Sequence, residues 1–126
     1  KGHCSYVHGY GRYVRLTFEA SELDERGWVM DFGDLKDVKK WIEAEWDHRV
    51  LIASDDPLLP QLKELESHGG ILLNVLPDGY YPGIEESCRY LYDMISPMIQ
   101  KKTNNRVEIT RVEIWEHENN SGEYVR

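Results

Sequence analysis

The spacing of hydrophobic residues predicts a strand followed by a helix in the first half of the chain. In residues 11–20, Val14, Leu16 and Phe18 alternate with more polar positions, as in a strand with one buried face. After a polar turn at residues 23–27, Asp31 provides a helix start signal. The apolar residues that follow recur at three- and four-residue spacing, which predicts an amphipathic helix: Leu35, Val38, Trp41, Ile42 and Trp46.

The middle of the chain predicts a short helix and a short buried strand. Leu58, Leu62 and Leu65 have helical spacing, and the glycines at 69 and 70 end that helix. Residues 71–76 form an apolar run that suits a buried strand.

The last third predicts a long helix and a final strand. We expect Pro82 to be the first residue of the helix, whose apolar stripe begins at Ile84 and which frays at Pro97. In residues 107–116 the parity of the apolar positions changes, which predicts a bulge near Thr110 or burial of both faces. This order of elements predicts a single α+β domain over residues 1–126, an antiparallel sheet with helices packed on one face.

Composition and charge exclude several classes of protein. Hydrophobic residues make up 40% and charged residues 30%, the balance of a globular domain, and no run is long enough to cross a membrane. The net charge of -8 and the scattered basic residues argue against nucleic-acid binding. Two distant cysteines do not make a disulfide scaffold, so we expect a cytoplasmic protein in which Cys88 is a small buried hydrophobe.

Four groups of residues have candidate chemistry, and each also has a purely structural explanation. Cys4 and His8 have the spacing of metal ligands or of a base and its partner, but also suit a surface turn. Asp47 beside His48 suits a catalytic base, or a histidine that caps the end of a helix.

The other two groups are single carboxylates. Glu116 shares parity with Val112 and Ile114, so it either points inward and binds a guanidine-like edge of a ligand, or lies in solvent at the strand end. Glu85 lies where a carboxylate stabilises the start of a helix.

Taken together and in order, these segments resemble the 6-pyruvoyl-tetrahydropterin synthase / 6-carboxytetrahydropterin synthase family, which has the tunnelling fold. The Asp-Phe-x-x-Leu-Lys block and the Trp-Glu strand end are the most specific matches. The matching blocks are Cys4-Ser5-Tyr6-Val7-His8-Gly9-Tyr10, Gly27-Trp28-Val29-Met30-Asp31-Phe32-Gly33-Asp34-Leu35-Lys36, Trp46-Asp47-His48, Pro82-Gly83-Ile84-Glu85-Glu86 and Val112-Glu113-Ile114-Trp115-Glu116.

The resemblance implies a zinc-dependent lyase acting on 7,8-dihydroneopterin triphosphate. By position, Cys4 is the expected base that removes a carbon-bound proton, and His48, beside Asp47, is its relay partner. Glu116 is expected to hold the pterin or join the relay, and Glu85 to contact the pterin. His8 is the expected zinc ligand.

The chain departs from the family pattern at its metal site. The family binds Zn²⁺ through three histidines, and of these only His8 is present. Tyr10 replaces the second histidine of the His-Gly-His block, and a phenol with a pKa of about 10 is a poor zinc ligand at neutral pH. The third ligand belongs to a first strand that we expect this domain to lack.

The expected product is 6-carboxytetrahydropterin, in deazaguanine (queuosine-type) biosynthesis. Two alternatives stay open: a 6-pyruvoyltetrahydropterin synthase, and a non-catalytic paralogue that binds a pterin or purine with a degraded zinc site. A purely structural or interaction domain is a third and weaker alternative. The resemblance also implies a homo-oligomer, a hexamer, in which sheets of several subunits join into a barrel around sites at subunit interfaces.

Overall fold

The structure is a computed structural model that describes residues 9, 11–117 and 120–126. In chain order the elements are β1 (Tyr13–Ala20), the 3₁₀-helix η2 (Phe32–Leu35), α1 (Lys36–Trp46), β2 (Val50–Ile52), α2 (Leu59–Ser67), β3 (Leu73–Val75), α3 (Ile84–Lys102), β4 (Val107–His117) and β5 (Asn120–Val125). No helix in the described part of the chain is long and apolar enough to span a membrane.

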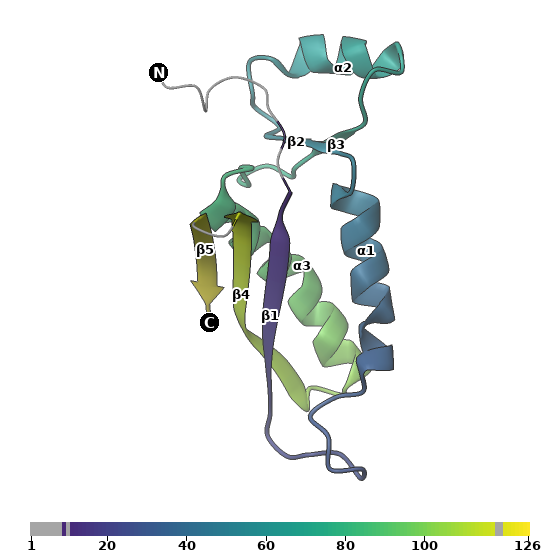
Figure 1. Cartoon of the computed structure of the whole chain (residues 1–126), viewed down its shortest axis with the longest axis vertical. Coiled ribbons are helices and arrows are strands. Elements are labelled where there is room, and N and C mark those ends of the chain that lie inside the picture. Colours follow the sequence, from purple (N-terminus) through teal and green to yellow (C-terminus); the bar gives the residue numbers. More distant parts are fainter. Residues whose placement is uncertain (1–8, 10, 118–119) are drawn as a thin grey trace.

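A three-stranded antiparallel sheet in the order β1-β4-β5 supports the fold. Helices α1 and α3 both pack on one face of this sheet, as predicted (Figure 1). The short helix α2 instead lies beside a separate two-stranded parallel sheet of β2 and β3, at one end of the molecule (Figure 1). The α+β class is therefore confirmed, with an additional small sheet at one end.

The core lies between α3 and the inner face of β4. Leu91 and Ile95 of the helix and Val112 and Ile114 of the strand are completely buried. Each fully buried aliphatic side chain contributes about 1.5–3 kcal/mol to the free energy of unfolding. The apolar positions of α1 and of β1 pack around the edge of this core.

Of the two alternatives predicted for the last long strand, a bulge or burial of both faces, the bulge is confirmed. Thr17 pairs with Arg111 and Phe18 with Ile109, so Thr110 is the extra residue on β4. The insertion explains the change in parity, because apolar residues on both sides of Thr110 still face the helices.

Two details of α3 differ from the prediction. The helix begins at Ile84 after the N-cap Gly83, so Pro82 precedes it and is not its first residue. The helix also continues through Pro97 to Lys102, because Ile95 and Ile99 anchor this last part of α3 in the core while Pro97 itself is exposed.

Asp31 begins a helix, as predicted, but the first turn is a 3₁₀ turn. Its carboxylate accepts a hydrogen bond from the backbone N–H of Gly33 at 2.8 Å. That bond, together with the Arg26 guanidinium at 3.2 Å, lowers the pKa of the Asp31 carboxyl. The Asp-Phe-x-x-Leu-Lys block therefore has a structural role here as the start of η2 and α1.

Helix α3 and strand β5 approach each other closely at Gly122. A Cβ atom at this position would lie 3.1 Å from Ile84 Cγ2, 3.5 Å from the backbone N of Glu85 and 3.6 Å from its Cα. The absence of a side chain at Gly122 thus sets how close the start of α3 lies to the sheet.

Gly122→Val is expected to lower the free energy of unfolding by about 1–3 kcal/mol, because the new methyl groups push the first turn of α3 away from β5. Urea denaturation measures the change. Ser121→Val is the matched control, since Ser121 is the neighbouring, exposed position of the same strand. Equal stability of the two variants would contradict the close approach.

Cys88 is expected to be unreactive in the folded protein. Its side chain is completely buried, and burial raises the pKa of the Cys88 thiol to about 11. At pH 8 only about one such thiol in a thousand is ionised, and the thiolate is the nucleophile. In the Cys4→Ala variant, a disulfide reagent should therefore react slowly with the native protein. After denaturation it should react with one thiol per chain, that of Cys88. Fast reaction of the native variant would show that Cys88 is accessible.

Candidate functional site

Several predicted site residues lie at the termini of helices and strands, and these termini are grouped at one end of the molecule. The start of β1, the end of β4, the end of α1 and the start of α3 all lie toward the end that carries β2 and β3 (Figure 1). These ends place Asp47 and His48, Glu85, and Glu116 on three different segments at one end of the fold.

His48 directly follows the end of α1 in an unusual backbone conformation. Asp47 is the extended C-cap of the helix, and His48 has a φ of 57°. Left-handed backbone of this kind is uncommon for residues other than glycine and is enriched at functional sites. Adjacent side chains usually point apart, but this turn brings them together: His48 Nδ1 lies 2.9 Å from Asp47 Oδ1.

The Asp47–His48 pair is open to solvent. The His48 side chain is 89% exposed and that of Asp47 65% exposed. With the proton on Nδ1, the imidazole donates to Asp47, and Nε2 is left as a base that faces outward. The pair therefore has the arrangement of an oriented general base.

Glu116 follows the buried part of β4 and lies at a second irregularity. Trp115 pairs with Ser121 of β5, whereas His117 pairs with Asn120, so Glu116 is an extra residue on β4. Its side chain is half-buried, beyond the completely buried Ile114. Bulges of this kind re-aim a side chain at the end of a strand.

Glu85 lies in the first turn of α3 and is exposed. A carboxylate there stabilises the helix through the partial positive charge of its N-terminus, so this position has a sufficient structural explanation. The close contact of Gly122 with the Glu85 backbone fixes where the helix start lies relative to β5.

Cys4 and His8, the expected base and zinc ligand, lie outside the described residues, as does Tyr10. Among residues 9, 11–117 and 120–126, no group of three or more His, Cys, Asp or Glu side chains could hold a metal ion.

Arg12 also lies at this end of the fold and is not among the site residues predicted from the sequence. It precedes β1 and has the same parity as Val14 and Leu16, which face the helices. Its guanidinium donates hydrogen bonds to Ser87 Oγ and to the Pro82 carbonyl oxygen, both at 2.8 Å. A cation in an inward-facing strand position is the signal that would have identified it, because such a charge needs partners.

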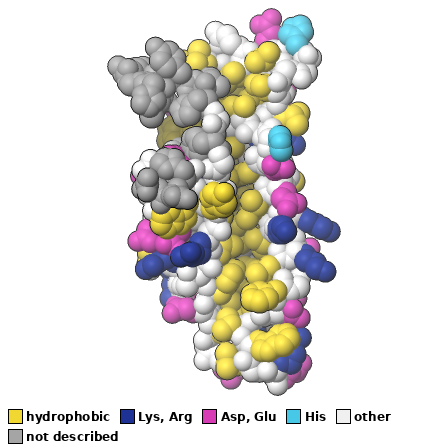
Figure 2. Space-filling view, in the orientation of Figure 1, with side chains coloured by type: hydrophobic (Ala, Val, Ile, Leu, Met, Phe, Trp, Pro, Cys, Tyr) yellow, Lys and Arg dark blue, Asp and Glu magenta, His cyan; other side chains and the backbone are white. Residues whose placement is uncertain are grey.

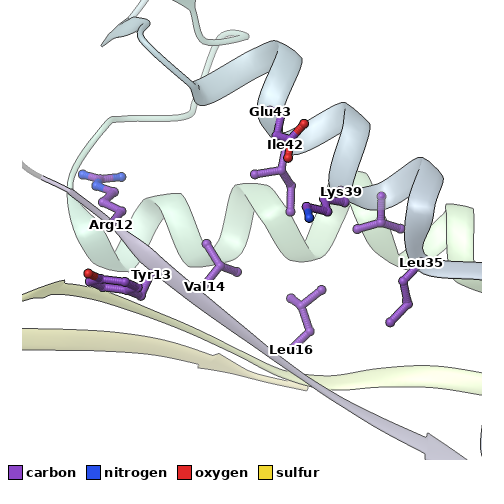
Figure 3. A pocket seen from close by; sticks show the side chains of 9 residues that line it. Arg12, Tyr13, Val14, Leu16, Leu35, Lys39, Ile42 and Glu43 are labelled. Carbon is purple, nitrogen blue, oxygen red and sulfur yellow. The ribbon is translucent and has the colours of Figure 1, made fainter. Parts of the chain in front are cut away.

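A shallow groove of about 390 Å³ runs between β1 and α1, and Arg12 lies near its end (Figure 3). Its lining is largely aliphatic, with Val14 and Leu16 from the strand and Leu35 and Ile42 facing them (Figure 3). Hydrophobic side chains form a band along this face of the molecule (Figure 2). Among the described residues that line it, the polar side chains are those of Arg12, Tyr13, Lys39 and Glu43.

Two enzymes resemble this chain over most of its length. The 6-carboxy-5,6,7,8-tetrahydropterin synthase of Aquifex aeolicus is 27% identical over 122 residues, which cover 96% of this chain and 75% of the relative. The enzyme of the same name from Rickettsia felis is 37% identical over 97 residues, covering 76% of this chain and 67% of the relative.

The fold is also found in a solved structure. The crystal structure of an uncharacterized protein from Wolinella succinogenes matches 98% of this chain and 81% of that chain, with a TM-score of 0.80 and 24% sequence identity. Finally, the family described as 6-pyruvoyl tetrahydropterin synthase matches residues 1–126, the whole of the sequence. The chain belongs to the 6-pyruvoyl tetrahydropterin synthase family.

Proposed function

We propose that this chain is a cytoplasmic lyase that converts 7,8-dihydroneopterin triphosphate and water to 6-carboxytetrahydropterin in deazaguanine (queuosine-type) biosynthesis, releasing triphosphate and the other two side-chain carbons as acetaldehyde. The names of the relatives from Aquifex aeolicus and Rickettsia felis support the carboxy product over the pyruvoyl one. The observation that carries the catalytic part of the proposal is the Asp47–His48 pair, a histidine oriented by a carboxylate on left-handed backbone.

In the proposed reaction the protein's own residues move a proton and hold the pterin. Cys4 acts as the base that removes a carbon-bound proton, since a thiolate is a competent base near neutral pH. His48 passes the proton on through Nε2 while Asp47 holds Nδ1 at 2.9 Å. Glu116 accepts hydrogen bonds from the guanidine-like edge of the pterin, and Glu85 contacts the same ligand.

The residues present do not fit the three-histidine zinc site of the family. Only His8 matches one of the expected ligands, Tyr10 replaces another, and the described residues contain no alternative cluster. A tyrosine at neutral pH is a poor substitute for a neutral imidazole. We therefore propose no reaction step through zinc, and treat Zn²⁺ binding as an expectation that metal analysis of the purified protein tests.

Tyr10 favours the second candidate, a paralogue that binds a pterin or purine without catalysis. Such a protein would keep Glu116 as an anchor but would not need an oriented histidine. Turnover and metal content together distinguish the two candidates.

We also propose that the chain forms a homo-oligomer, with the hexamer of the resemblance as its expected form. Within the described residues, β1 and β5 are the edge strands of the sheet, each paired only with β4. Unpaired edges invite pairing with another chain. Large aromatic side chains are also exposed, with Tyr13 72% and Phe32 87% accessible.

Protein from the full-length gene is expected to convert 7,8-dihydroneopterin triphosphate to 6-carboxytetrahydropterin, detected by mass spectrometry. Cys4→Ala should abolish the product, and His48→Gln should lower turnover about 10²- to 10⁴-fold, the usual contribution of general acid–base catalysis. His68→Gln is the matched control, because His68 is an exposed histidine at the end of α2.

Each other outcome of this assay has a definite meaning. A pyruvoyl product would assign the chain to the sibling activity. No turnover by folded, oligomeric protein that still binds a pterin would favour the non-catalytic paralogue. Equal losses in His48→Gln and His68→Gln would remove His48 from the mechanism.

Light scattering at micromolar concentration should give a mass several times the 14.8 kDa of one chain, sixfold for a hexamer. Phe32→Ser should shift the mass toward the single chain if this exposed aromatic residue lies in an interface. A monomer in the unmodified protein would count against the functional proposal, since sites shared between subunits would be incomplete.

A further inference from the structure

One side chain, Arg12, contacts or adjoins each of the three segments that carry candidate site residues. Its guanidinium carbon lies 5.4 Å from the centre of the Trp46 ring, and Trp46 directly precedes Asp47 and His48. Its hydrogen bonds to Pro82 and Ser87 reach the two sides of the start of α3.

The third segment is the end of β4. Tyr13, the residue after Arg12, pairs with Trp115, the residue before Glu116. Arg12 is therefore next in sequence to the strand pair that borders the candidate pterin anchor.

The groups that contact Arg12 are themselves held by burial or by hydrogen bonds. Ser87 is buried, and its hydroxyl also donates to the Pro82 carbonyl oxygen at 3.2 Å, so the three groups form one hydrogen-bonded unit. The indole N–H of Trp46 is buried without an acceptor in the described part of the chain. Packing and the guanidinium, not a hydrogen bond of its own, hold that ring.

We propose that Arg12 is a positioning residue of the active site, which holds the Asp47–His48 pair, the start of α3 with Glu85, and the end of β4 with Glu116 in a fixed arrangement. The inference deepens the proposed function and rests on it, because kcat and KM can be measured only if the chain catalyses the proposed reaction. Arginine suits this role because its planar fork donates to two acceptors while its face stacks on an aromatic ring. Lysine keeps the positive charge but lacks the several planar donors and the flat face of the guanidinium.

The test compares Arg12→Gln, Arg12→Lys and Arg12→Ala with Arg15→Gln. Arg15 is the matched control, because it is three residues further along on the outer face, its side chain is 71% exposed, and its contact is a 3.9 Å ion pair with Glu113. Two readouts are used: kcat and KM per folded subunit, and amide hydrogen exchange of residues 46–48 and 83–87.

We expect Arg12→Gln to lower kcat about 10- to 100-fold, the usual cost of displacing catalytic groups by about 1 Å. Arg12→Lys should be intermediate, and added guanidinium should restore part of the activity of Arg12→Ala, which a merely destabilised protein would not show. Amide hydrogen exchange of residues 46–48 and 83–87 should be faster in the Arg12 variants than in the unmodified protein. It should be unchanged in Arg15→Gln.

An unchanged kcat in Arg12→Gln, or changes that Arg15→Gln reproduces, would overturn the proposal. Where Arg12→Gln does not fold, Arg12→Lys gives the same comparison. Where the unmodified protein makes no product, the proposed function fails separately, and the exchange pattern alone decides whether Arg12 holds these segments.

Discussion

The packing of α3 on β4 is the constraint on which the rest of the fold depends. The completely buried residues Leu91, Ile95, Val112 and Ile114 make this contact, and β1, β5 and α1 are arranged around it. The direction of α3 follows, because its start lies against Gly122 of β5, where no side chain intervenes. The same packing therefore brings the start of α3, the ends of α1 and β4 and the start of β1 to one end of the molecule (Figure 1).

The candidate site lies at the termini of helices and strands, and this explains why some of its side chains are held rigidly and others are exposed. Ser87 is buried and the half-buried Arg12 is hydrogen-bonded to it, whereas the Asp47–His48 pair is open to solvent. A rigid scaffold that holds exposed reactive groups at its edge is the usual arrangement of functional loops. The described residues leave the Asp47–His48 pair open to solvent, which agrees with the proposal that a neighbouring subunit completes the site.

Periodicity predicted the parts of the fold whose positions are set by burial. The amphipathic helices and the bulge at Thr110 follow from apolar parity, because slipping by one residue would expose the core face. Strand β5 was not predicted, since Asn120–Val125 begins with turn-type residues and forms only because β4 offers a partner edge. The three-residue β2 and its parallel pairing with β3 were missed for the same reason: they depend on contacts distant in sequence.

Motifs in the sequence identified the predicted site residues, but they could not predict which of their side chains meet in the fold. Side chains at adjacent positions usually diverge, so only the backbone shows that Asp47 and His48 meet, through a φ of 57° at His48. This backbone region is uncommon for residues other than glycine, although histidine adopts it more often than most. A binding paralogue gains nothing from an exposed histidine held in this way, whereas a proton relay needs one ring nitrogen fixed and the other free. The left-handed turn therefore supports the proposed proton relay, while Tyr10, which replaces an expected zinc ligand, supports the binding paralogue.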